Sequence, residues 1–186
     1  MSYHKTPLKY GATVVDEFLP KTLENVSILE VDEYTPNFSD FKAKLNEVLV
    51  NPIGSKPFDE LVKEIYEHGK IVMFIVDDNT RPNIHTRALL PPLIERLFNL
   101  GVKKEDIKII IASGSHKKPS PEAIESRILG SELYSEWKGN VLIHDCDSGN
   151  RDLGMTKKGA PILIDEQVLG ASLLIPLSDS EYHYFA

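Results

Sequence analysis

Three apolar stretches of the chain each end at residues that can carry out chemistry. The stretches are 71–76, 107–111 and 141–143, and polar side chains follow each of them directly. The residues at these ends are Asp77, Asp78, Thr80 and Arg81 after the first, Ser113, Gly114, Ser115 and His116 after the second, and His144 and Asp145 after the third. A histidine exchanges a proton near neutral pH, and an arginine fork suits a carboxylate or a phosphate. The pattern indicates proton transfer and anion binding at one place.

The turn after the second stretch has the features of a ligand-binding loop. Its small residues, 113–115, leave backbone N–H groups open to a ligand. Ser120 followed by Pro121 is the N-cap and first-turn pattern of a helix. Ligands of open α/β sheets sit just beyond the carboxyl end of such a strand, so we expect His116 to stand where chemistry is done.

Each of these groups also has a purely structural interpretation. Arg81 could pair with Asp77 or Asp78 in a surface network, and His116 could be an ordinary loop histidine. Asp145 could cap a turn, which would make His144 and Asp145 structural. The remaining candidates favour a structural interpretation, namely a solvated pair at Lys117–Lys118 and an inert thiol at Cys146.

The elements that must position these residues alternate between strands and helices. The β-branched stretches 71–76 and 107–111 are typical of strands buried on both faces. Helical spacing and capping signals predict helices over 39–50, 58–67, 86–100 and 120–129. Further strands are predicted at 13–15, 26–29, 161–164 and 173–175.

This order predicts an α/β fold with a parallel or mostly parallel sheet, helices on both faces and a Rossmann-like arrangement. Strands 71–76, 107–112 and 141–144 should be adjacent, which brings Arg81, His116 and His144 to one edge. One difficulty is Pro91–Pro92, because a proline inside a helix costs about 3 kcal/mol. The third helix should therefore begin at Pro91 or be kinked there.

Length and charge limit the possible functions. The 186 residues suffice for one α/β domain or for part of a larger protein, and the net charge of -7 argues against a general nucleic-acid binder. The single cysteine excludes an internal disulfide and fits a cytoplasmic protein. No apolar run approaches the ~20 residues that span a membrane.

An ordered set of motifs resembles the N-terminal part of the LarA-type lactate racemases, which use a nickel-pincer nucleotide. The motifs are Leu8–Gly11, Asn51–Ser55, Asp78–Pro82, Ala112–Lys117, His144–Asp145 and His183–Ala186. Each motif is weak alone, but the set occurs in order over nearly the whole chain.

The resemblance implies an isomerase, a racemase or epimerase of lactate or another 2-hydroxy acid. In the family, a modified pyridinium mononucleotide carries nickel in the cleft between two α/β domains, and a hydride moves reversibly between it and the substrate. By motif, the two acid–base histidines correspond to His116 and His183, and the substrate-binding arginine to Arg81. Asp78 is implied to help seat the cofactor, with Thr80 and residues 113–115 as further cofactor contacts.

The family continues beyond the last motif with a glycine-rich stretch, a lysine that holds the pincer, a nickel-ligating histidine and a second domain. None of these is present here, so no metal ligand is assigned, and Tyr182 stands where the family commonly has proline. Residues 1–186 are therefore expected to form the N-terminal domain of such an enzyme, truncated before its C-terminal domain. Alone, this chain is expected to be inactive and without the cofactor.

Two other functions stay open from the residues. One is a non-catalytic module that binds a nucleotide or phosphate on the amides of residues 113–115. The other is a metal-dependent hydrolase, although no closely spaced pair of histidines supports it. Its ligands would be His85, His116, His144 and Asp145.

Overall fold

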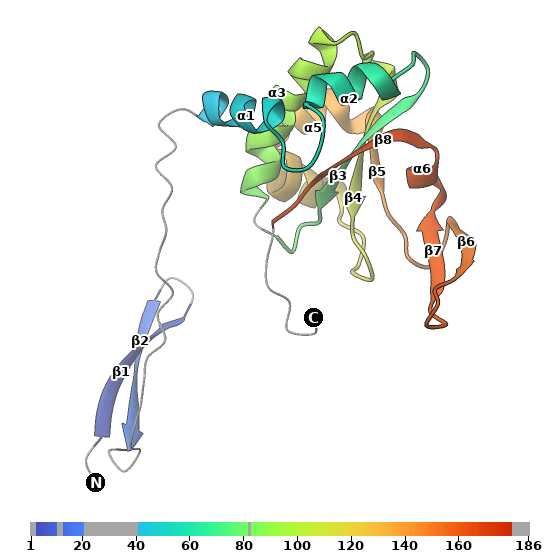
Figure 1. Cartoon of the computed structure of the whole chain (residues 1–186). Helices are drawn as coiled ribbons and strands as arrows, with labels where there is room; N and C mark the ends of the chain where they lie inside the picture. The colour runs from blue at the N-terminus through green and yellow to red at the C-terminus, as the bar shows by residue number, and fades with distance from the viewer. Residues whose placement is uncertain (1–2, 11–12, 21–40, 82, 180–186) are drawn as a thin grey trace. The chain divides into compact units, whose positions relative to one another are not determined.

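A computed structural model of the chain describes residues 3–10, 13–20, 41–81 and 83–179 (Figure 1). The chain divides into two compact units, residues 1–39 and residues 40–186. Among the described helices, none is both long and apolar enough to cross a membrane.

The first unit contains an antiparallel hairpin of β1 (Tyr3–Tyr10) and β2 (Thr13–Pro20). The predicted strand at 13–15 is confirmed as part of β2, whereas β1 was not predicted. Pro7 lies within β1, and a two-stranded hairpin tolerates it because both strands are edges. The predicted strand at 26–29 lies outside the described residues.

The second unit contains the remaining elements. Its strands are β3 (Ile71–Asp77), β4 (Ile107–Ala112), β5 (Val141–Ile143), β6 (Asn150–Met155), β7 (Pro161–Asp165) and β8 (Ala171–Leu177). Its α-helices are α1 (Phe41–Val50), α2 (Phe58–Ile65), α3 (Ile84–Asn99), α4 (Pro121–Ala123), α5 (Ser131–Trp137) and α6 (Glu166–Leu169). Three other helical segments are η1 (Lys104–Asp106), the π-helical η2 (Ile124–Leu129) and η3 (Lys138–Asn140).

Four strands form a parallel sheet in the order β5-β4-β3-β8 (Figure 1). This confirms the predicted α/β fold and the adjacency of the strands at 71, 107 and 141. The predicted strand at 161–164 also exists, as β7, but it pairs antiparallel with β6 in a separate hairpin.

The core lies between one face of this sheet and a layer of helices. Val72 and Phe74 of β3 and Ile109 and Ile111 of β4 are fully buried on this face, and the intervening Met73 and Ile110 are also buried. The side chains on this face pack against apolar side chains of α2, α3, η2 and α5 in one continuous cluster. Because each buried aliphatic side chain contributes about 1.5–3 kcal/mol, this layer stabilises the strands that carry the candidate site.

The helix α3 continues without interruption through the paired prolines, so a start at Pro91 is wrong. It begins at Ile84, after Asn83 in the left-handed region with φ 56°. Leu90, Leu93 and Leu97 of this helix are buried in the core. That burial offsets the backbone hydrogen bonds that the prolines cannot donate.

The predicted helix at 120–129 forms as α4 followed by η2. Ser120 is its N-cap, with Oγ accepting from the N–H of Ala123 at 3.2 Å. The segment ends at Gly130, whose φ of 85° suits glycine. The next helix, α5, is only seven residues long and was not predicted.

Candidate active site

The three predicted turns follow the carboxyl ends of adjacent parallel strands. Asp77 at the end of β3 lies in register with Ala112 of β4, and Ile111 of β4 with Ile143 of β5. The residues that continue from these ends therefore emerge at the same edge of the sheet. Figure 1 shows the loops leaving β3, β4 and β5 together at this edge.

Asp78 is the buried centre of the site, only 4% exposed. Its Oδ2 lies 2.6 Å from Nδ1 of His116, and its Oδ1 accepts from the N–H of Thr80 at 2.9 Å and from the hydroxyl of Thr80 at 2.5 Å. Burial alone would raise the pKa of this carboxyl, but the hydrogen bonds from Thr80 and His116 outweigh it and leave the pKa below its ordinary value.

This geometry fixes how His116 can act. An ionised carboxylate only accepts hydrogen bonds, so Nδ1 of His116 must be the donor toward Asp78. The other ring nitrogen, Nε2, has no partner among the described residues, and the side chain is 56% exposed. His116 is thus oriented by a buried carboxylate while Nε2 stays free to exchange a proton.

Asn83 shapes the turn that carries Asp78 and Arg81, and it was not recognised from the sequence. Its side chain is fully buried and donates to the carbonyl oxygens of Asp78 at 2.6 Å and Arg81 at 3.0 Å. Its Oδ1 accepts from the hydroxyl of Thr86 at 3.2 Å. The available signal was an asparagine just before a helix, since asparagine tolerates the left-handed region and favours helix starts.

Arg81 lies on the surface of this turn, and its guanidinium has no hydrogen-bond or ion-pair partner in the described part of the chain. The alternative surface network with Asp77 or Asp78 does not form. Asp78 is engaged by Thr80 and His116, and Asp77 lies against Ser178 and His85. The fork is therefore available to an anion.

The small-residue loop offers two open backbone donors. The N–H of Ser113 is bonded to the carbonyl of Ile111 at 3.0 Å, and Ser113 is 1% exposed. The N–H groups of Gly114 and Ser115 have no partner within the described residues. Gly114 has φ 54°, a conformation that favours glycine.

His144 and Asp145 directly follow β5 and have different roles. Asp145 accepts from the N–H of Asp147 and the hydroxyl of Ser148, which confirms its turn-capping interpretation. Lys118 lies 2.6 Å from this carboxylate and holds its pKa well below the usual range. Both residues of the Lys117–Lys118 pair are exposed, as predicted; Lys118 pairs with Asp145, and Lys117 has no partner in the described chain.

His144 instead pairs with Asp165, which the sequence did not reveal. Nδ1 of His144 lies 2.9 Å from Oδ2 of Asp165, a residue of β7 that is 7% exposed. The two residues are 21 positions apart; His144 follows β5 of the parallel sheet, and Asp165 ends β7 of the separate hairpin. No local pattern could have signalled this contact.

His85 bridges two carboxylates near the end of β3. Its Nε2 lies 3.3 Å from Asp77, and its Nδ1 lies 3.2 Å from Asp179. These three groups are close enough to share a metal ion. The predicted hydrolase ligands, His85, His116, His144 and Asp145, do not form such a group among the described residues, although His116, His144 and Asp145 line one cavity.

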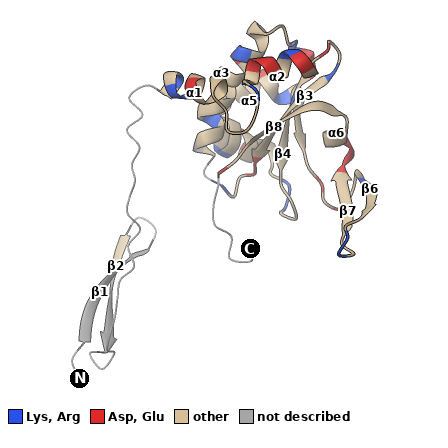
Figure 2. Ribbon diagram, viewed as in Figure 1, with Lys and Arg blue, Asp and Glu red and all other residues tan. Residues whose placement is uncertain are grey.

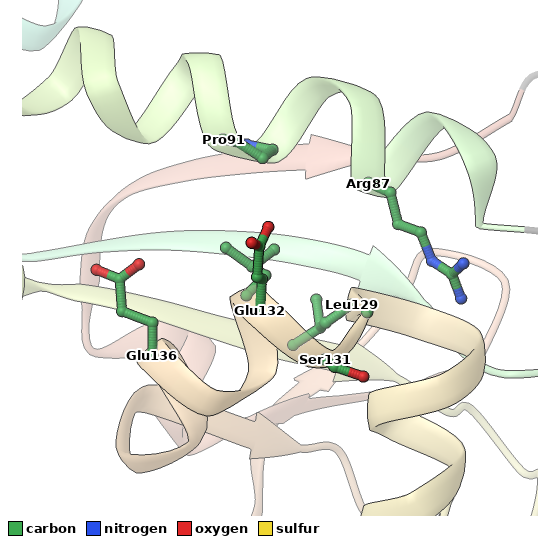
Figure 3. A pocket seen from close by; sticks show the side chains of 8 residues that line it. Arg87, Pro91, Leu129, Ser131, Glu132 and Glu136 are labelled. Carbon is green, nitrogen blue, oxygen red and sulfur yellow. The ribbon is translucent and has the colours of Figure 1, made fainter.

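Of two cavities, one lies at this edge of the sheet and the other does not. One of about 340 Å³ is lined by residues 114–118 and 144–147, the loops after β4 and β5. A second of about 630 Å³ lies between α3 and α5 (Figure 3). There Arg87 is already bonded to the carbonyls of Ser126 and Ile128, and none of the predicted site residues contributes. The smaller cavity, which Gly114, Ser115 and His116 line but Asp78, Thr80 and Arg81 do not, is therefore the candidate ligand cavity.

The exposed thiol of Cys146 borders that cavity. Desolvation and the negative charges of Asp147 and Asp145 raise the pKa of Cys146, so the thiol stays protonated near neutral pH. The remaining predicted residue, His183, lies outside the described residues.

Comparison with known proteins agrees with the resemblance that the sequence motifs indicate. The family model of the lactate racemase N-terminal domain matches residues 10–186. The lactate racemase apoprotein from Thermoanaerobacterium thermosaccharolyticum shares the fold, with a TM-score of 0.68 and 23% identity over 93% of this chain. The chain spans only 38% of the length of that structure. No curated protein matches the sequence. Since the family model covers nearly the whole chain, the protein belongs to the lactate racemase N-terminal domain family.

Proposed function

We propose that this chain is the N-terminal domain of a racemase or epimerase of 2-hydroxy acids that depends on a nickel-pincer nucleotide. The observation that carries the proposal is the pair of Asp78 and His116 at the sheet edge, with the free guanidinium of Arg81 on the same turn as Asp78. Family membership supports an isomerase, and the site supports proton exchange beside an anion.

His116 is the proposed acid–base group for the substrate hydroxyl. Nε2 takes the hydroxyl proton when the α-carbon is oxidised and returns it when the carbon is reduced. Asp78 keeps the ring oriented through Nδ1. A well-placed histidine of this kind contributes about 10²–10⁴ in rate.

Arg81 is the proposed carboxylate-binding group. Its planar fork can hold both oxygens of a 2-hydroxy acid, which fixes the α-carbon relative to His116. When the carboxylate is fixed, each enantiomer can place its own hydroxyl within reach of an acid–base group.

The cofactor fits the donors of the small-residue loop. The unpaired N–H groups of Gly114 and Ser115 suit the phosphate of a mononucleotide. Asp78 and Thr80 are already hydrogen-bonded to each other, so their proposed role is to shape the protein surface beside the cofactor. When bound, the nickel-pincer nucleotide supplies a reversible hydride acceptor for the α-carbon.

Other parts of the proposal depend on segments that are not described. His183 is the proposed second acid–base residue, by its motif alone. The pincer-holding lysine, the nickel ligand and the C-terminal domain belong to the rest of the proposed enzyme. A cytoplasmic location is part of the proposal, since a single free cysteine fits a reducing compartment.

A second candidate is a module that binds phosphate on the amides of Gly114 and Ser115 without catalysis. The same open donors favour it. It differs from the first proposal in requiring neither Arg81 nor the free Nε2 of His116.

The test is conversion of single enantiomers of lactate and of other 2-hydroxy acids by the complete, cofactor-loaded protein, followed by chiral chromatography. We expect both enantiomers of at least one acid to interconvert. For the variant His116→Ala, the matched control is His68→Ala. His68 pairs with Asp106 as His116 pairs with Asp78, but it lies near the amino end of β3. Absence of conversion for every acid, with cofactor bound, would support the non-catalytic module.

A further inference from the structure

The cavity of about 340 Å³ contains a histidine to which the proposed function gives no role. It is His144, at the end of β5, which borders the cavity together with His116. Its side chain is 23% exposed. The cavity lies at the carboxyl edge of the parallel sheet, where α/β proteins bind their ligands.

The two histidines of this cavity are held in the same way. Each uses Nδ1 toward a buried aspartate, His116 toward Asp78 at 2.6 Å and His144 toward Asp165 at 2.9 Å. Oδ1 of Asp165 is separately occupied, because it accepts from the N–H of Gln167 at 2.9 Å. His144 is therefore locked through Nδ1, and its Nε2 has no partner in the described part of the chain.

Such a pair is not a site by itself. His68 and Asp106 show the same contact, Nδ1 to Oδ2 at 3.0 Å, near the amino end of β3. What distinguishes His144 is the cavity and the other donors that border it.

Those other donors suit an anion. The N–H groups of Gly114 and Ser115 are unpaired among the described residues, and so is the ammonium of Lys117. Figure 2 shows the basic residues on the loop that leaves β4. Lys118 is neutralised by Asp145, and Asp147 adds one negative charge, so the ligand must be held by directed hydrogen bonds more than by net charge.

We propose that this cavity binds the oxyanion group of a small molecule on the N–H groups of Gly114 and Ser115, with His144, in its doubly protonated form, donating from Nε2. Asp165 orients the ring through Nδ1. The proposal rests on the proposed function for the identity of the oxyanion, which is either the phosphate of a nucleotide or the carboxylate of a hydroxy acid. Both present the same acceptor oxygens to these donors.

The experiment titrates the isotopically labelled 186-residue chain with inorganic phosphate and, separately, with lactate, and follows it by NMR. We expect saturating shifts of the Gly114 and Ser115 amides and of the His144 ring nitrogens. Tighter binding of phosphate would identify the nucleotide phosphate as the ligand, and tighter binding of lactate the substrate carboxylate. No saturating shift at these groups with either probe would overturn the proposal.

The variants are His144→Ala and His144→Gln, with His68→Ala as the matched control. Loss of a hydrogen bond to an anion should weaken binding roughly tenfold in both His144 variants. His144→Gln keeps a polar side chain of similar size next to Asp165, so it remains informative if the alanine variant fails to fold. Unchanged affinity in a folded His144 variant would refute the role of His144.

This outcome is separate from the fate of the proposed function. If the complete enzyme converts no hydroxy acid while the chain binds phosphate through His144, the racemase proposal fails and the oxyanion site stands. If conversion occurs and the His144 variants bind both probes normally, the oxyanion site fails and the racemase proposal stands.

Discussion

Arg81 is the residue whose proposed role depends most on the shape of a side chain. Its guanidinium is exposed and unpaired within the described chain, so it is available to bind a ligand. In the complete enzyme we expect Arg81→Lys to lower kcat/KM by a factor of ten or more, about 1.4 kcal/mol, because a point charge cannot replace a bidentate fork. The measurement is steady-state kinetics with several 2-hydroxy acids.

The control for this substitution is Arg151→Lys. Arg151 is also exposed and makes only a 3.5 Å ion pair with Glu166 on the β6–β7 side of the chain. Its replacement should leave kcat/KM unchanged. Equal kinetics in the Arg81 and Arg151 variants would argue against carboxylate binding by Arg81.

Asp106 is the residue with the clearest effect of pH on stability. It is 5% exposed and accepts hydrogen bonds from the Tyr66 hydroxyl and the Gly69 N–H, with His68 also in contact. Burial would raise its pKa, but these bonds outweigh burial and lower it. A lowered pKa in the folded state stabilises the protein above the ordinary pKa and ceases to do so as pH falls through the folded value.

We therefore expect Asp106→Asn to destabilise the chain by about 1–3 kcal/mol near pH 6, with a smaller difference below about pH 4. Urea unfolding of both proteins across this pH range is the measurement. A difference that stays constant down to about pH 3 would contradict the assignment of this carboxylate.

At the scale of elements, the start of α3 links the core to the site. Asn83 has positive φ, is fully buried and bonds to three other residues, so it couples the turn of Asp78 and Arg81 to the helix. We expect Asn83→Ala to cost about 2–4 kcal/mol, because it combines backbone strain with lost hydrogen bonds. Asn83→Gly should cost less, since glycine relieves the strain. Denaturant unfolding would compare them, and an alanine variant as stable as the glycine variant would exclude strain at this position.

The elements that could be predicted were those with a strong apolar pattern. The strands at 71, 107 and 141 have buried, β-branched residues, and their order along the chain was enough to predict a parallel sheet. The extent of α3 could not be predicted, because only the packing of Leu90, Leu93 and Leu97 shows that the helix tolerates two prolines. Helix α5 has seven residues, too few for a clear period.

The candidate site was predictable where its residues follow a strand directly. His116, Arg81 and Asp78 were proposed in this way. The partners of His144 and His85 were not, because Asp165 and Asp179 lie on distant segments and their contacts depend on the tertiary fold. The role of Asn83 is set by backbone geometry that its residue type only favours.

At the scale of the whole molecule, the chain forms two compact units. The site and the core belong to residues 40–186. We expect a chain beginning at Asp40 to unfold cooperatively, with a Tm within ~4 °C of the full chain, the shift produced by about 1 kcal/mol in a small domain. Differential scanning calorimetry would test this, and loss of the cooperative transition would show that residues 1–39 are part of the same folding unit.

The most direct test of the account is the rate of racemisation in the complete enzyme after His116→Ala, measured from both enantiomers together with bound nickel. Because His116 is the proposed acid–base group, we expect the rate to fall by about 10²–10⁴ in both directions, with nickel content unchanged. We expect an equally large fall for His183→Ala, the proposed second acid–base residue. His68→Ala, which removes the equivalent imidazole near the amino end of β3, should leave the rate at the wild-type level. Racemisation at the wild-type rate in the His116 variant, or loss of nickel along with the rate, would contradict the account.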